Sequence, residues 1–367
     1  MMRVPFLDVK ASYVALKPEL ERAFRRCMES GIYISGDEVA LFEKEFAAFH
    51  QVEHCIGVAN GLEALQLILM ALEIGPGDEV IVPAHTFIAT WLAVSFTGAK
   101  PVAVDVDLDT FNLDAALIHG AITKRTRAIL PVHLYGQSAE MDAVLREADL
   151  AKIAVVEDAA QAQGARYRGV FVGGFGAAAG VSFYPGKNLG AYGDAGAVLT
   201  RRDDLNERIR QLRNYGSLRK YYHERVGLNS RLDPLQAAFL RVKLEKLNEW
   251  NARRAALAAY YLHELAEVPG IHLPRVAEGC EPVWHLFVIR CDRRDALQTF
   301  LAEHRIETLI HYPVPPHLSG AYAADCAGQR FPVAEKIAKT ALSLPIGPHM
   351  TTEQAEWVVE TVKRFAA

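Results

Sequence analysis

The sequence contains no long apolar run. No stretch approaches the ~20 consecutive apolar residues that a membrane-spanning helix needs, so we expect no transmembrane segment. Near the start of the chain, charged residues such as Arg3 and Asp8 interrupt the apolar ones, and this segment therefore cannot supply the apolar core of a secretory signal peptide. We expect a cytoplasmic protein.

The net charge is small, and the chain has few cysteines. A formal net charge of −4 on 367 residues gives no support for binding to nucleic acid or to a membrane surface. Five cysteines, at positions 27, 55, 280, 291 and 326, show neither the spacing of a metal site nor a disulfide framework. We expect reduced thiols and no metal.

The chain has enough apolar residues to form a large hydrophobic core. Its 51% hydrophobic and 23% charged residues are typical of a folded globular protein and give no sign of disorder. By length alone two or three domains are expected, and one large α/β domain with a smaller one attached fits equally well. We predict a large domain over residues 1–250, including an N-terminal helical segment, and a small α+β domain over residues 251–367.

Short apolar runs alternate with amphipathic stretches between about residues 55 and 200. This is the βαβ rhythm of a mainly parallel sheet with helices on both faces. The predicted strands are Cys55–Ala59, Glu79–Pro83, Pro101–Asp105, Ala128–His133, Ile153–Glu157, Gly180–Tyr184 and Gly196–Thr200. Ligands of such sheets bind outside the carboxyl ends of the strands. A site is therefore expected where Asn60, His85, Asp158 and Ser182 collect.

The pattern changes in the last third of the chain. From Pro234 to about Glu267, leucines and alanines recur at helical spacing, which predicts a long helical stretch leading out of the large domain. Beyond Pro269 the small domain is expected to contain a strand over Trp284–Arg290, a helix over Arg293–Glu303, a short strand over Ile306–Ile310 and a closing helix from Thr351.

Lys187 and Asp158 are the most informative pair of residues. Lys187 follows a predicted strand and has Pro185, Gly186 and Gly190 close by, which let the backbone approach a ligand. Pyridoxal phosphate (PLP) needs an amine to hold its aldehyde and an acid to keep its ring nitrogen protonated. Lys187 as that amine and Asp158 as that acid indicate a PLP enzyme. The ordinary alternatives are a solvated surface lysine and an aspartate that caps a helix.

The cofactor phosphate and ring have candidate partners too. Gly61 and Leu62 open a helical pattern after a strand, so their N–H groups and the helix terminus suit an anion, and the Ser182 hydroxyl could join them. An ordinary strand-to-helix turn is the other interpretation of Gly61. Phe87 offers a face for the ring, with His85 as the second choice. A core phenylalanine is the ordinary alternative. Gln161 could reach the ring hydroxyl.

Taken together, the motifs resemble one known family, and the match covers nearly the whole chain. They are Asn60-Gly61-Leu62-Glu63-Ala64, His133-Leu134-Tyr135-Gly136-Gln137, Glu157-Asp158-Ala159-Ala160-Gln161-Ala162, Ser182-Phe183-Tyr184-Pro185-Gly186-Lys187-Asn188-Leu189-Gly190 and Gly227-Leu228-Asn229-Ser230-Arg231-Leu232-Asp233. As a set they look like the DegT-type nucleotide-sugar aminotransferases. Four shorter segments are similar to the members that aminate dTDP-3-keto-6-deoxyhexoses: Arg213–Ser217, Lys220-Tyr221, Asn229–Asp233 and Gln236–Ala238.

The resemblance implies a fold-type I PLP-dependent transferase with a mainly parallel seven-stranded sheet. It also implies a homodimer in which Asn229 of one subunit reaches the PLP phosphate of the other. The expected substrate-binding residues are His85, Tyr184, Arg219, Lys220, His311 and Tyr312. One departure is that Asn60-Gly61-Leu62 stands where many members carry Ser-Gly-Thr, so a hydroxyl contact to the phosphate is lost.

The implied reaction moves an amino group from L-glutamate, through the pyridoxamine form of the cofactor (PMP), to a keto sugar linked to dTDP. The expected products are 2-oxoglutarate and a dTDP-3-amino-3,6-dideoxyhexose. A 4-aminotransferase of the perosamine type shares the same cofactor machinery and remains an alternative. A sugar dehydratase of the family would carry histidine in place of Lys187. A PLP-binding regulator without activity is the alternative from another class.

Overall fold

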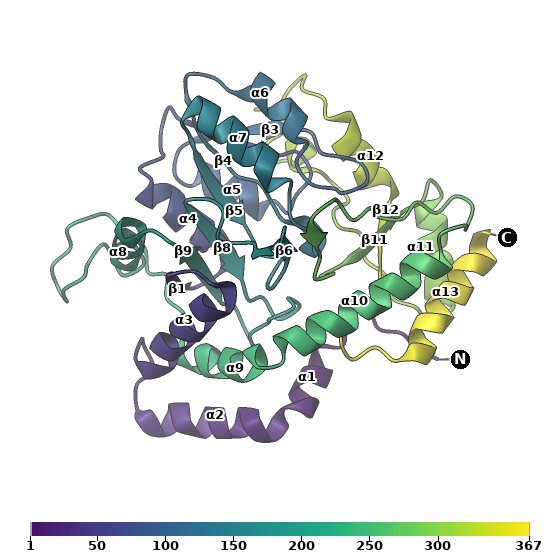
Figure 1. The fold of residues 1–367 in the computed structure, drawn as a ribbon, viewed down its shortest axis with the longest axis horizontal. Coiled ribbons are helices and arrows are strands. Elements are labelled where there is room, and N and C mark those ends of the chain that lie inside the picture. The colour runs from purple at the N-terminus through teal and green to yellow at the C-terminus, as the bar shows by residue number, and fades with distance from the viewer. Residues whose placement is uncertain (1, 367) are drawn as a thin grey trace.

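The computed structural model describes residues 2–366, and a seven-stranded sheet forms its centre. The strands are β1 (His54–Val58), β2 (Glu79–Pro83), β3 (Lys100–Val104), β4 (Thr126–Ile129), β5 (Ala154–Asp158), β8 (Ala178–Ser182) and β9 (Gly196–Thr200). Their order across the sheet is β1-β9-β8-β5-β4-β2-β3. Strand β9 is antiparallel to β1 and β8, whereas the other neighbours are parallel. The predicted mainly parallel sheet is confirmed (Figure 1).

Each of the seven strands lies where the sequence predicts one, with boundaries that differ by a few residues. The largest difference is in β4, which ends at Ile129 although the prediction extended to His133. Pro131 has no N–H to donate to a ladder. Beyond it, the backbone pairs with β5 in an isolated bridge between Val132 and Asp158 rather than in a continuous ladder.

Helices cover both faces of the sheet, because alternate strand residues point to opposite sides. On one face, α4 (Gly61–Ala71), α5 (Ala89–Ser95) and α8 (Asp203–Leu212) bury a core that includes Val80 and Val82. On the other face, α6 (Ile118–Ala121) and α7 (Met141–Ala151) pack over Ile81. Helix α3 (Asp37–His50) covers β1 and β9 on that second face.

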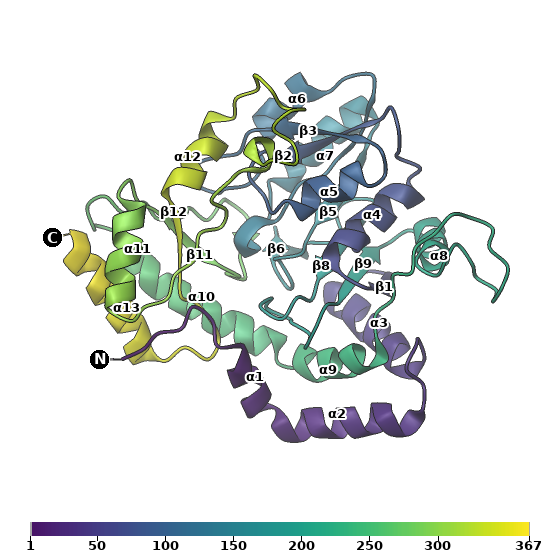
Figure 2. The same ribbon diagram turned by 180° about the vertical axis from the view of Figure 1, so that it is seen from behind.

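The last third of the chain forms its own apolar cluster. It contains a two-stranded antiparallel sheet packed by three helices, and Val4 joins it from the N-terminal segment. The elements are β11 (Phe287–Arg290), β12 (Ala341–Leu344), α10 (Leu247–Glu264), α11 (Arg294–Glu303) and α13 (Thr352–Ala366), with α12 (Pro332–Thr340) alongside. Figure 2 shows this part beside the main sheet. The predicted boundary between domains at residue 250 stays a prediction.

Two local expectations need correction. The strand predicted over Ile306–Ile310 does not form, because Ile306 pairs with Val4 and Leu309 pairs with Ser343, in two separate bridges. The long helical stretch is two helices, since α9 (Pro234–Leu244) ends before α10 begins at Leu247.

Several smaller elements complete the fold. At the N-terminus lie α1 (Val9–Ala15) and α2 (Lys17–Ser30), and α2 packs on α9. A small sheet pairs β10 (Cys280–Glu281) with β6 (Arg166–Tyr167), which also pairs with β7 (Val170–Phe171). No helix within residues 2–366 is both long enough and apolar enough to cross a membrane.

Candidate active site

A cavity of about 550 Å³ lies at the carboxyl ends of the central strands. Strands β5 and β8 contribute Asp158 and Ser182, and Phe6 of the N-terminal segment closes part of its wall. The cavity brings together most of the predicted site residues: Gly61, Leu62, Phe87, Asp158, Gln161, Ser182, Tyr184, Lys187, His311 and Tyr312. A larger hollow of about 730 Å³ among α2, α3 and α9 holds none of them.

Lys187 lies in a closed loop after β8. The Lys187 N–H donates to the Tyr184 carbonyl at 2.8 Å, and the Ala191 N–H donates to the Phe183 carbonyl at 2.7 Å. Only glycine fits at position 190, because a Cβ there would lie 2.4 Å from the Pro185 oxygen. Burial lowers the pKa of Lys187 to about 8, and the Asp158 carboxylate opposes that shift. The Lys187 amine is therefore closer to its neutral, nucleophilic form than an exposed lysine would be.

Asp158 is buried at the end of β5 with both oxygens bonded. Its Oδ2 accepts from the Thr90 hydroxyl at 2.8 Å, and its Oδ1 accepts from the Ala160 N–H at 3.1 Å. Burial raises the pKa of Asp158, although these hydrogen bonds and Lys187 favour the charged form. A cationic ring nitrogen in the cavity would provide the counter-charge that this buried carboxylate needs.

Gln161 has its side-chain amide fixed in one orientation. The Tyr135 N–H donates to Gln161 Oε1 at 2.7 Å, so the amide nitrogen faces the other way and donates to the Tyr312 hydroxyl at 3.0 Å. Gln161 therefore presents a donor toward the cavity. That is the polarity a ring oxygen would require.

The N-terminus of α4 provides the anion-binding end of the cavity. The Asn60 side chain caps the helix by accepting from the Glu63 N–H at 2.9 Å. The N–H groups of Gly61 and Leu62 precede the first carbonyl-paired turn, so they have no partner within the helix. A Cβ on Gly61 would lie 2.7 Å from the Ser182 Cβ, which is why glycine is needed where the helix approaches β8.

The two predicted partners of the ring lie differently. Phe87 faces the cavity and is 53% exposed, with its ring 5.4 Å from the Tyr312 ring. His85 is buried outside the cavity lining and its Nε2 lies 2.8 Å from the Tyr135 hydroxyl. Burial lowers the pKa of His85 to about 3, so it is a neutral imidazole. Of the two, Phe87 offers the accessible aromatic face.

Three other predicted residues, Arg219, Lys220 and Asn229, also lie outside the cavity. They belong to residues 213–231, a segment that we call the arm. Arg219 and Lys220 are exposed and stack on exposed Tyr222 and Tyr221, at 4.3 and 5.1 Å from the ring centroids. Asn229 is exposed and forms an isolated bridge with Asn214. The arm extends from α8 at the edge of the molecule opposite α11 and α13 (Figures 1 and 2).

These residues fit PLP and the positions that it requires. A partly neutral lysine, a buried carboxylate, an oriented amide donor, a free helix N-terminus beside a serine and an exposed aromatic face line one cavity. The close approach of Gly61 to Ser182 makes a backbone cradle that suits a phosphate. When bound, the cofactor supplies an aldehyde for amines and an electron-withdrawing ring.

Several supporting residues were not identified from the sequence. Thr90 donates to Asp158, and Tyr135 orients Gln161. The available signal for Thr90 was its spacing of four residues from Thr86, since their hydroxyls lie 2.9 Å apart. Tyr135 gave no signal, because its role depends on a left-handed backbone conformation with φ of 58°.

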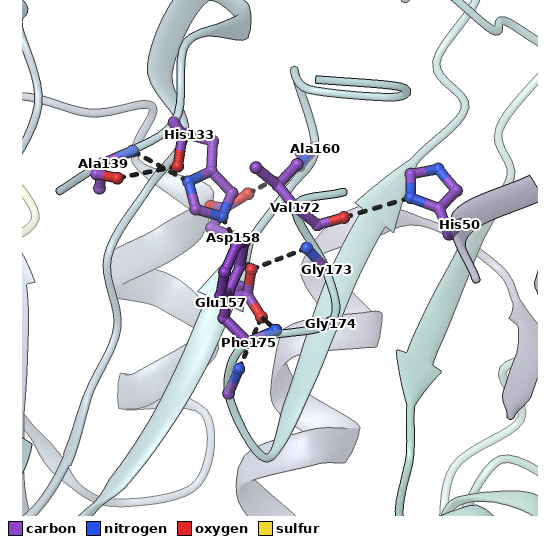
Figure 3. Close-up of polar contacts among 12 residues, drawn as sticks. His50, His133, Ala139, Glu157, Asp158, Ala160, Val172, Gly173, Gly174 and Phe175 are labelled. Carbon is purple, nitrogen blue, oxygen red and sulfur yellow. Dashed lines mark hydrogen bonds and ion pairs between the residues drawn. The ribbon is translucent and has the colours of Figure 1, made fainter. Parts of the chain in front are cut away.

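Glu157, next to Asp158 on β5, points to the opposite side of the strand (Figure 3). Its carboxylate is fully buried and accepts from the N–H groups of Gly173, Phe175 and Gly176 at 2.7 to 2.9 Å. His133 Nδ1 accepts from the Ala139 N–H, so its Nε2 is the donor to Glu157 at 3.0 Å. These bonds keep the pKa of Glu157 low and fix the loops on both sides of β5.

Comparisons with known proteins agree with this site. Residues 15–363 match the model of the DegT/DnrJ/EryC1/StrS aminotransferase family. The chain is 55% identical over 365 residues to a dTDP-3-amino-3,4,6-trideoxy-alpha-D-glucose transaminase of Streptomyces venezuelae, with 99% of this chain and 96% of the relative covered.

Two solved structures extend the similarity. S. venezuelae DesV in complex with a ketimine intermediate superposes with a TM-score of 0.98 at 55% identity, covering 100% of this chain and 99% of that one. A Bacillus subtilis protein, ntda, with bound cofactor PMP, superposes with a TM-score of 0.93 at 31% identity, covering 100% of this chain and 86% of that one. The cofactor of this enzyme is thus PLP, which alternates with PMP. The chain belongs to the DegT/DnrJ/EryC1/StrS aminotransferase family.

Proposed function

We propose that this aminotransferase transfers an amino group from L-glutamate to C3 of a dTDP-linked 3-keto-6-deoxyhexose. The observation that carries this proposal is the single cavity holding Lys187, Asp158 and Gln161, in a chain 55% identical to a dTDP-3-amino sugar transaminase. The products would be 2-oxoglutarate and a dTDP-3-amino-3,6-dideoxyhexose.

Lys187 would be the catalytic residue in both halves of the reaction. Its Nζ would hold the cofactor covalently at rest, and it would take a proton from the α-carbon of the donor once the donor amine had displaced it. A pKa near 8 suits this work, because the same group must act as an amine nucleophile and as a proton carrier around neutral pH.

Three residues would tune and hold the ring. Asp158 would keep the ring nitrogen protonated, and the Thr90 hydroxyl holds that carboxylate in place. Gln161 would donate to the ring oxygen through its amide nitrogen, which faces the cavity because the Tyr135 N–H bonds the amide oxygen. Phe87 would pack on the ring face, a contact worth about 0.5–1.5 kcal/mol for an aromatic pair beyond area burial.

We also propose a homodimer in which the arm of one subunit completes the cavity of the other. The support is that Asn229, Arg219 and Lys220 lie outside their own cavity. In addition, α2 and the segment after it expose a run of apolar side chains that a monomer would leave in water. These are Phe24, Met28, Ile32, Tyr33 and Ile34, each 42–53% exposed.

Within that dimer, Asn229 would bond the cofactor phosphate of the partner, and Arg219 and Lys220 would hold the nucleotide diphosphate. Tyr184, His311 and Tyr312, which line the cavity, would hold the sugar, with His85 behind them. Arginine and lysine are the side chains that recognise phosphate groups.

The first test is the visible spectrum of the purified enzyme before and after L-glutamate is added. The band of the lysine-bound cofactor should bleach while a PMP band rises. The PMP enzyme should then aminate a 3-keto-6-deoxyhexose on dTDP, with a 4-hydroxyl or a 4-deoxy carbon, at least about tenfold more efficiently than the UDP-linked or 4-keto analogues.

Each other outcome identifies an alternative. Preference for a 4-keto sugar would establish the perosamine-type activity in place of the proposed one. A spectrum that no amino acid changes would contradict the transaminase assignment and support a PLP-binding regulator.

A further inference from the structure

A second buried lysine, Lys243, contacts the loop that carries Lys187. Lys243 of α9 is only 3% exposed, and its Nζ donates to the Gly190 carbonyl at 2.7 Å. The same ammonium lies 3.6 Å from the centroid of the Tyr192 ring. None of the reaction steps described above uses Lys243.

The environment of Lys243 is unusual for a cation. Nearly all buried lysines are paired with a carboxylate, because a buried charge without a partner is costly. Among residues 2–366, burial is the one resolved influence on its pKa, which falls to about 8. The ammonium form still prevails at neutral pH, and a carbonyl and an aromatic face take the place of a counter-ion.

The two contacts of Lys243 bear directly on the geometry of the Lys187 loop. Gly190 lies against Pro185 on the opposite side of the loop, as its missing Cβ requires. Between them, Asn188 donates to the Val283 carbonyl at 2.9 Å and to the Asn251 side chain at 2.8 Å. Lys187 is thus adjacent to Asn188, whose side chain is held by these two bonds. It is three positions from Gly190, whose carbonyl accepts from Lys243.

Tyr192 completes the arrangement. Its backbone N–H donates to the Gln236 side chain of α9 at 2.8 Å, and its carbonyl accepts from the same amide at 3.3 Å. Helix α9 therefore contacts residues 190–192 through a charged hydrogen bond, a cation–π contact and an amide bridge. All three act on the end of the Lys187 loop.

We propose that Lys243 is a positioning residue, whose ammonium group holds the Gly190 carbonyl and the Tyr192 ring so that the loop presents the Lys187 amine to the cofactor aldehyde. Lys243 has no contact with the cavity itself. Its effect should be confined to the step that needs Lys187 in place.

The two forms of the cofactor provide a test that separates positioning from general support of the fold. PLP carries the aldehyde and gains affinity from its covalent link to Lys187, whereas PMP has an amine there and forms no link. The Lys187→Ala variant sets the reference, because it abolishes the link while leaving the cavity. Dissociation constants for both forms would be measured by equilibrium dialysis, beside the absorbance of the lysine-bound cofactor.

For Lys243→Met we expect the dissociation constant of PLP to rise about tenfold, the loss typical of one charged hydrogen bond, while that of PMP changes less than about twofold. The absorbance of the lysine-bound band should fall in parallel. Lys44→Met is the matched control, since Lys44 is an exposed lysine of α3, and it should change neither constant.

Equal weakening of PLP and PMP by Lys243→Met would overturn the proposal, because it would mean that the residue supports the cavity as a whole. Unchanged affinity for both forms would overturn it as well. If Lys243→Met does not fold, Tyr192→Leu and Tyr192→Phe decide the question in its place. Tyr192→Leu removes the aromatic face and should weaken the binding of PLP but not that of PMP. Tyr192→Phe keeps the aromatic face and should weaken neither. Any other result for this pair of variants contradicts the proposal.

Discussion

The cavity and the arm are built in opposite ways. Residues of the cavity are held by short hydrogen bonds within the fold, as when Thr90 bonds Asp158 and Tyr135 bonds Gln161. The arm instead exposes aromatic and basic side chains, among them Tyr221 at 79% and Val226 at 90% exposed. The cavity residues are fixed at the ends of strands, whereas the arm is exposed and would be covered only in the proposed dimer.

Among changes to the cavity, replacing the Lys187 amine should have the largest effect on activity. Lys187→Ala removes the nucleophile and the proton carrier together, so we expect kcat to fall about a thousandfold or more. The melting temperature of the apoprotein should not fall, since the variant also removes a buried amine. Turnover at the unmodified rate would disprove the role of Lys187.

The next largest effect is expected at the carboxylate. Asp158→Asn keeps the shape but cannot hold a proton on the ring nitrogen, so kcat should fall about a hundredfold, as for loss of an electrostatic partner in a buried site. Thr90→Val, which removes only a hydroxyl donor to Asp158, should cost less. If Asp158→Asn and Thr90→Val lowered kcat by the same factor, the negative charge of Asp158 would not be the property that supports catalysis.

A hybrid dimer tests whether the arm serves the other subunit. Lys187→Ala and Asn229→Asp should each be nearly inactive alone, the second because a carboxylate would face the cofactor phosphate. Mixed in equal amounts and allowed to exchange subunits, they should recover about one quarter of the wild-type activity, since half the dimers are hybrids with one intact site of two.

The absence of recovery, in a mixture shown to exchange subunits, would assign Asn229 to its own cavity. A sedimentation measurement of the unmodified enzyme should first show a dimer. A mass of one chain at micromolar concentration would contradict the shared site altogether.

Loading of the apoprotein with PLP should follow the pKa of the buried amine. Because burial lowers the pKa of Lys187 to about 8, the neutral fraction rises about fivefold between pH 7 and 8 and less than twofold between pH 8 and 9. The rate of covalent loading, followed by absorbance, should level off accordingly. A rate that kept rising tenfold per pH unit would indicate an ordinary, exposed lysine.

The smallest effects are expected at the tip of the arm. Arg219→Ala and Lys220→Ala should each raise KM for the nucleotide sugar a few-fold, because exposed charge contacts contribute roughly 0.2–1 kcal/mol and are screened by salt. The half-reaction with glutamate should not change, which distinguishes substrate contacts from cofactor contacts. Arg202→Ala, an exposed arginine of the same region paired with Asp204, serves as the control.

The sequence alone determined the strands of the central sheet, the edge at which the cavity lies and most of the residues that line it. It could do so because these depend on local properties: strand periodicity, glycines where the backbone must approach another segment, and a lysine and an aspartate in known order. It also identified the family, because the motifs around Asp158 and Lys187 are specific as a set.

Tertiary structure decided how those residues are held. The amide orientation of Gln161, the Thr90 bond to Asp158 and the Lys243 bond to Gly190 each join segments separated by 26 to 68 residues, and no local pattern encodes such contacts. The pKa of Lys187 likewise follows from burial, which only packing creates. Periodicity also could not show that Ile306 and Leu309 would form bridges with two different segments. Which backbone a residue pairs with depends on the segment that lies beside it in the folded chain.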